Sequence, residues 1–162
     1  MTTTSGQALV AGHFESPPFV VPNVKGECFK IEQVVYRSPE ATQKLVWWFG
    51  PDDDRDPHNH PWAFDSEILS GGYTSVTYWL DNGTVKSEDR LVRAGDLVYY
   101  PLNEYHIVKD VLPGTRTRMT CGQATPNYAW GYLDPKTGQE YPASQDPTFM
   151  ARMLVLNPWR NR

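Results

Sequence analysis

Residues 56–73 read DPHNHPWAFDSEILSGGY, and residues 95–110 read GDLVYYPLNEYHIVKD. The two segments hold three of the four histidines of the chain: His58, His60 and His106. Successive side chains of a strand alternate between its faces, so His58 and His60 are expected on one face. A neutral imidazole offers a lone pair to a metal near physiological pH. We therefore expect two antiparallel strands to direct three imidazoles into one cavity, where they hold a divalent metal.

The spacing of these segments resembles the paired motifs of the cupin superfamily, which are small antiparallel double-sheet barrels. The positions that match the family pattern are His58, His60, Gly72, Gly95, Pro101 and His106. Three positions depart from it: Asp65 replaces Glu, Asn103 replaces Gly, and Asp110 replaces Asn. The resemblance covers residues 50–110 and implies a barrel with a metal centre. It does not define the reaction, because one fold hosts many chemistries.

Short strands separated by turn signals are expected elsewhere, as in an all-β barrel or sandwich. The predicted fold is a single cupin double-stranded β-helix (jelly-roll) barrel with an N-terminal arm and a C-terminal extension. The arm is placed at residues 1–26 and the cupin domain at 27–162, with a metal-binding core at about 45–122. Gly71-Gly72 and Asn82-Gly83 are expected to form tight hairpin turns, and residues 39–43 a short helix. The candidate strands are residues 28–36, 44–49, 62–69, 73–80, 97–101, 105–110 and 115–122.

The region after Gly122 is expected to extend the barrel. Residues 127–133 are predicted to form a strand that pairs with residues 139–141 and closes part of the barrel mouth. An apolar stripe that includes Met153 and Leu156 is expected to pack on the barrel or on a second subunit. Many cupins are dimers, so the resemblance implies a possible homodimer.

Composition narrows the class of partner. A net charge of −4 and a pI near 5.5 give no basic surface for nucleic acid. No apolar run approaches the ~20 residues of a membrane span, and no signal peptide is visible. Cys28 and Cys121 alone do not make a disulfide framework. We expect a cytoplasmic protein.

A fourth, acidic ligand has two candidates. Asp65 has the spacing of the family, whereas Glu67 has its residue type and shares the strand face of Asp65. His60 and Asp65 differ in strand parity, so Asp65 reaches the metal only if the chain bends between them, and Pro61 is a suitable place. The third alternative is that neither carboxylate binds, which leaves a three-histidine site.

Arg118 and Tyr105 are the candidate catalytic residues. Arg118 follows the third histidine by one strand and would clamp a substrate carboxylate if even positions face inward. The opposite parity places Thr117, Met119 and Cys121 inward and leaves Arg118 in solvent. A buried phenol near the metal, such as that of Tyr105, would act as an acid or hydrogen-bond donor. The run 52–54 (Asp-Asp-Asp) is expected to be a solvated loop.

The phrase 57–61 (Pro-His-Asn-His-Pro) resembles the thiol-dioxygenase branch of the superfamily, in which three histidines hold ferrous iron. The resemblance implies an Fe(II) oxygenase that acts on a small organic molecule and O2. Mn and Ni also suit such ligands, and Zn would imply hydrolytic or Lewis-acid work. A metal-dependent isomerase, epimerase or lyase is the alternative enzyme, and a non-catalytic small-molecule-binding cupin is the alternative without turnover.

Overall fold

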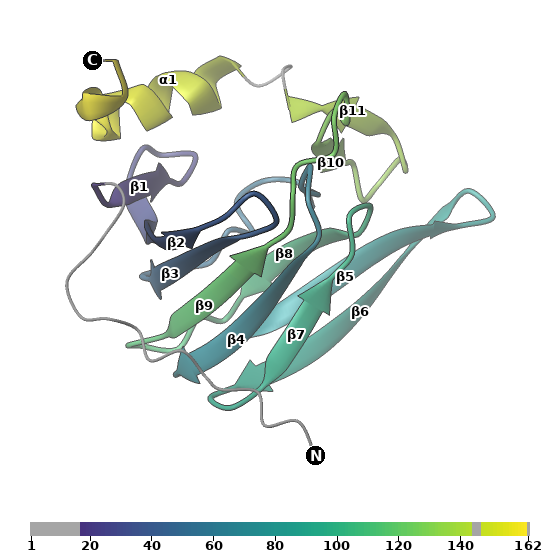
Figure 1. Cartoon of the computed structure of the whole chain (residues 1–162). Helices are drawn as coiled ribbons and strands as arrows, with labels where there is room; N and C mark the ends of the chain where they lie inside the picture. The colour runs from purple at the N-terminus through teal and green to yellow at the C-terminus, as the bar shows by residue number, and fades with distance from the viewer. Residues whose placement is uncertain (1–16, 144–146, 162) are drawn as a thin grey trace.

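The computed structural model of the chain describes residues 17–143 and 147–161 and has two facing β-layers (Figure 1). One layer is an antiparallel sheet of six strands in the order β1 (Phe19–Pro22), β2 (Cys28–Arg37), β3 (Thr42–Trp48), β9 (Arg116–Cys121), β4 (Phe64–Ser70) and β7 (Leu97–Tyr100). The other layer contains β6 (Thr84–Arg93), β5 (Gly72–Asp81) and β8 (Tyr105–Lys109), in that order. A hairpin of β10 (Gly131–Leu133) and β11 (Glu140–Pro142) follows, and the chain ends with α1 (Pro147–Leu156) and a 3-10 helix (Pro158–Asn161).

The core lies between the two layers because alternate side chains of each strand face inward. On β4, Phe64, Ser66 and Ile68 are buried, whereas the odd positions between them are half-buried on the outer face. Val46 and Trp48 of β3 follow the same rule. The predicted all-β fold of packed antiparallel sheets is therefore confirmed.

Two glycine-containing turns differ in what they join. Asn82 and Gly83 have φ of 49° and 79° and connect the paired strands β5 and β6, as a tight hairpin requires. Gly71 and Gly72 form no hairpin, because β4 and β5 belong to different layers, so the hairpin prediction is wrong there. Gly71 has φ of 68°, and a Cβ on it would lie 2.3 Å from Thr115 Oγ1. This corner carries the chain between the sheets at a close approach that only glycine permits.

Other sequence predictions are corrected by local geometry. The helix expected at residues 39–43 is absent: Ser38 N donates to Ala41 O, and β3 begins at Thr42. The ten-residue strand β6 had no predicted counterpart. Part of the predicted arm, Phe19–Pro22, is strand β1, which pairs with β2 at the edge of the six-stranded sheet.

The C-terminal extension is tied to that edge. The predicted hairpin is present as β10 and β11, and α1 packs beside β1 (Figure 1). Met153 of α1 is buried in the core cluster, and Leu156 is half-buried. Asn157 Oδ1 accepts from Val20 N at 2.7 Å, and its Nδ2 donates to Val20 O at 2.7 Å. Among the residues described, no helix has the length and apolar character to cross a membrane.

Candidate metal centre

Backbone pairing fixes the histidine-bearing segments relative to one another. His58 lies in the connection between β3 and β4 and forms isolated β-bridges with His106 of β8 and with Tyr132 of β10. His58 N donates to His106 O at 3.1 Å, and His106 N donates to His58 O at 3.0 Å. The segment around His58 thus lies between β8 and β10 and extends the second layer.

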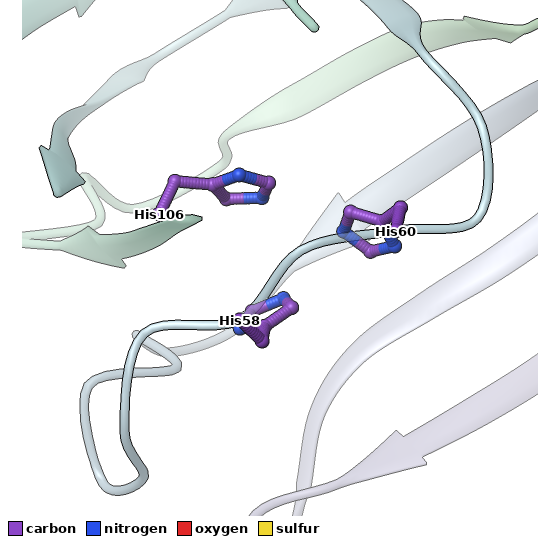
Figure 2. Close-up of side chains that lie close together, drawn as sticks. All are labelled: His58, His60 and His106. Atoms are coloured by element: carbon purple, nitrogen blue, oxygen red, sulfur yellow. The ribbon is translucent and has the colours of Figure 1, made fainter. Parts of the chain in front are cut away.

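The three imidazole rings converge on one space (Figure 2). The ring centroid of His58 lies 5.1 Å from that of His60 and 5.0 Å from that of His106, and the last two are 5.2 Å apart. One nitrogen from each ring lies within 4.8 Å of the others. The structure therefore brings together the three histidines that the sequence singles out.

The environment of these rings favours neutral imidazoles. Burial, followed by the nearby cations Lys30 and Arg55, lowers the pKa of His58 to about 3. Burial and the His58 ring lower the pKa of His106 to about 3 as well, and that of His60 is also well below its usual value. The Nδ1 atoms of His58 and His106 are buried and have no hydrogen-bond partner among the described residues. Neutral, buried nitrogens without partners are a donor set that fits a divalent metal.

Neither predicted carboxylate joins this cluster. Phe64 and Ser66 face the histidines from β4, so Asp65 and Glu67 lie on the outer face of the same strand. Because β4 begins at Phe64 with that side chain inward, a bend at Pro61 does not bring Asp65 to the interior. The arrangement corresponds to the third alternative, a cluster of histidines alone.

Arg118 and Tyr105 also lie away from the rings. Thr117, Met119 and Cys121 are the inward residues of β9, and Arg118 Nε lies on the outer face, 3.6 Å from Glu67 Oε2. The Tyr105 hydroxyl donates to Glu140 Oε1 at 2.9 Å on the side of β8 opposite to His106. The inward arginine and the catalytic tyrosine expected from the sequence are therefore not found at the cluster.

Asp52 lies beside the histidines, which corrects the prediction that residues 52–54 are all solvated. Its side chain is 3% exposed, Oδ1 accepts from Val108 N at 2.5 Å, and Oδ2 lies 3.9 Å from His58 Nε2. Burial raises the pKa of Asp52. Nothing in a run of three aspartates distinguishes the first, because its burial depends on β8, a strand distant in sequence.

Two tyrosines close the inner side of the site. The Tyr100 ring lies 4.7 Å from the His106 ring and stacks on Phe64 at 4.6 Å, centroid to centroid. The Tyr100 hydroxyl lies 2.9 Å from Ser75 Oγ and 3.5 Å from the Tyr73 hydroxyl. The side chains of Phe64, Tyr73 and Tyr100 and the three histidines line a cavity of about 20 Å³, room for little more than an ion and a water.

Comparison with known proteins finds structures of the same fold but no related sequence. No protein-family model matches the sequence, and no curated protein matches it. Among solved structures, Streptomyces PAC13 with uridine is 15% identical with a TM-score of 0.50, over 81% of this chain and 90% of that one. Streptomyces albus HEPD, with 2-hydroxyethylphosphonate and Fe(II) bound, is 15% identical with a TM-score of 0.54, over 70% of this chain but 26% of that one. Oxalate decarboxylase from Bacillus subtilis is 16% identical with a TM-score of 0.51, over 74% and 30% of the two chains.

These likenesses agree with the two facing β-layers. The chain has the cupin fold, and three histidines converge in its interior.

Proposed function

We propose that the chain is a mononuclear metal-dependent enzyme whose metal is held by His58, His60 and His106. The convergence of one nitrogen from each ring within 4.8 Å carries the proposal. The rings of His58 and His106 are buried and that of His60 is half-buried, and the unpartnered Nδ1 atoms of the two buried rings need a compensating ligand. Asp52 Oδ2 lies 3.9 Å from His58 Nε2, beyond hydrogen-bond distance, and we infer that it orients this ring from behind when the site is filled.

The proposed reaction is oxygenation of a small organic molecule, with Fe(II) as the metal and O2 as co-substrate. A site with a few imidazole ligands and open positions suits non-haem Fe(II), which supplies activation of dioxygen when bound; Mn, Ni and Zn compete for the same nitrogens. Phe64 and Tyr100 exclude water from the inner side of the site. HEPD, which shares the fold, is an Fe(II)-bound protein.

Elemental analysis of protein expressed with added iron is the first test. Wild type and Asp65→Asn should carry about one equivalent of metal, whereas His58→Ala and His106→Ala should lose most of it. Equal metal content in all four proteins contradicts the proposed ligands. Loss of metal in Asp65→Asn as well as in the two histidine variants supports the carboxylate ligand expected from the sequence.

A lyase or isomerase reaction is the second candidate. PAC13 is similar over most of both chains, and Pac13 is described as a nucleoside dehydratase. Oxygen uptake with candidate substrates separates the two readings: an oxygenase consumes O2 with turnover, and a lyase turns over at the same rate without it. Metal-free protein after anaerobic iron loading supports the third possibility, a binding protein without turnover.

A further inference from the structure

Three charged side chains lie inside the barrel, next to the histidines. Lys30 and Glu32 on β2 and Lys44 on β3 face inward. Lys44 has the same strand parity as Val46 and Trp48, which are core residues of β3. Lys30 Nζ lies 2.9 Å from Glu32 Oε1, and Lys44 Nζ lies 2.9 Å from Glu32 Oε2. We call these residues the interior triad.

The triad connects the metal centre with a larger pocket. Lys30 lines the small cavity that holds the histidines, whereas Lys44 lines a neighbouring pocket of about 390 Å³. Trp62 lines the larger pocket and stacks on His60 of the metal centre. Its ring stacks on His60 at 6.0 Å, centroid to centroid, and Lys44 Nζ lies 5.5 Å from its centroid. A molecule in the larger pocket would therefore touch an ammonium group and the Trp62 ring that stacks on His60.

The charges of the triad do not balance. Burial alone would raise the pKa of Glu32, but the two ammonium groups lower it to about 2, so this carboxylate is ionised. Burial alone would lower the pKa of Lys44, but Glu32 raises it, so this lysine stays charged. One carboxylate faces two ammonium groups. Asp52 also lines the small cavity, and the charge of Lys30 acts to lower the pKa of its carboxyl group, whereas Lys44 pairs with Glu32 alone among the described carboxylates.

The side chain of Lys44 is 20% exposed, and a cation so far removed from water is costly unless an anion accompanies it. Each ammonium has three N–H donors, and Lys44 donates one hydrogen bond to the protein, to Glu32. Its remaining donors lie at the wall of the 390 Å³ pocket, which Arg37 also lines. Lys30 also lies over the Phe29 and Trp48 rings, 5.6 and 5.0 Å from their centroids, so Lys44 is the ammonium group that a ligand in this pocket would meet.

We propose that this pocket binds a small organic anion, whose carboxylate, phosphonate or phosphate group pairs with Lys44 while its carbon skeleton packs on Trp62 and extends toward the histidines. If the chain is the proposed metal enzyme, this anion is its substrate class, and that part of the inference rests on the proposed function. The anion-binding part depends on β2, β3 and the pocket alone.

The test is a ligand titration of the isolated protein, in which binding is measured by calorimetry and by changes in backbone amide chemical shifts. The metal content of the same samples is measured as well. The probes are propionate, methylphosphonate and the neutral propionamide. Either anion should bind and shift the amides of β3 and of residues 122–124, and propionamide should bind at least roughly tenfold more weakly. The stronger of the two anions identifies the acidic group. Equal binding of propionate and propionamide, or no binding of either anion, overturns the proposal.

Two substitutions locate the site. Lys44→Met keeps the Lys30–Glu32 pair and should weaken the better anion by roughly tenfold or more. Lys86→Met removes an exposed lysine of β6 as the matched control and should bind as wild type does. Lys44→Arg should retain the binding. If Lys44→Met fails to fold, the comparison of propionate with propionamide on wild type still decides.

Metal content separates this inference from the proposed function. Normal metal with no preference for an anion overturns the inference alone. Anion binding that depends on Lys44 in a protein that takes up no metal overturns the proposed function alone.

Discussion

Asp52 and Asp53 are adjacent and chemically identical, yet the first is buried and the second is exposed. Asp52 exchanges two hydrogen bonds with the backbone of Val108, two residues after His106 on β8. Its other oxygen is directed to the ring of His58. The carboxylate thus links the segments that carry two of the three histidines.

Asp52→Asn is expected to weaken the metal site without unfolding the protein. The asparagine Oδ1 keeps the bond from Val108 N, whereas the negative charge behind His58 is lost. Loss of such an orienting carboxylate lowers metal affinity by roughly 10- to 100-fold. Competition with a chromophoric chelator measures the affinity, and Asp53→Asn is the control. Equal affinities in the two variants would show that Asp52 serves the backbone alone.

At the residue scale, sequence reasoning succeeds where the motif itself carries the information. His58, His60 and His106 could be selected because their spacing fits two strands. Asp52 could not, because its partner on β8 is known only from the fold. The sequence also does not show which residues of β4 face inward. A shift of one residue moves Asp65 from the interior to the surface, and the connection before Phe64 determines which of the two occurs.

A strand could be predicted from the sequence when its apolar and polar residues alternate clearly. Strand β5 has buried residues and was found nearly whole, whereas β6 has a single buried residue, Val92. Half of the residues of β6 are charged and their order shows no apolar alternation, so the strand is recognised only by its pairing with β5. Gly71-Gly72 was recognised as a turn, but two glycines do not tell a hairpin from a change of sheet.

The corner between β4 and β5 predicts a stability difference between two glycines. Gly71 and Gly83 both have left-handed φ, 68° and 79°, but a Cβ would collide with Thr115 at Gly71 and meet nothing within 4 Å at Gly83. Gly83→Ala should cost only backbone strain, about 1–2 kcal/mol. Gly71→Ala adds overpacking and should cost roughly 2–4 kcal/mol. Urea unfolding of both variants checks this, and equal losses would mean that the corner adapts.

The ion pairs of Glu32 between β2 and β3 should make the stability of the protein depend on pH. Its pKa falls from 4.5 to about 2 on folding, so the unfolded state binds more protons between these values. The stabilisation by the two lysines is therefore complete above about pH 4.5 and is lost as the pH falls toward 2. In thermal unfolding, Glu32→Gln should be much less stable than wild type at pH 7, and the gap should shrink by pH 3. Glu88→Gln, on the exposed strand β6, controls for the loss of an acidic charge; a gap for Glu32→Gln that stays constant with pH contradicts the ion pairs.

At the scale of the whole molecule, the two ends of the described chain close one edge of the barrel. Strand β1 lies at the end of the six-stranded sheet, where unpaired backbone groups are a liability. Helix α1 covers that edge, with Met153 inserted in the core and Asn157 bonded to both backbone groups of Val20. The sequence predicted an apolar stripe that includes Met153, but it did not indicate the segment that this stripe would meet.

Asn157 is therefore expected to hold the two extensions together. It is fully buried, and its Nδ2 also donates to Met153 O at 2.8 Å. Asn157→Ala leaves Val20 N and O without partners, and each such group costs about 1–3 kcal/mol. Denaturant unfolding should show this loss, whereas Val155→Ala, at a residue that is 77% exposed, should change stability by less than about 0.5 kcal/mol.

Hydrogen exchange measures the effect of Asn157 on β1 locally. The Val20 amide should exchange faster in Asn157→Ala, while the exchange of the β5 amides should change only as much as global stability does. Unchanged protection at Val20 would mean that Met153 and the apolar contacts of α1 hold β1 without the asparagine.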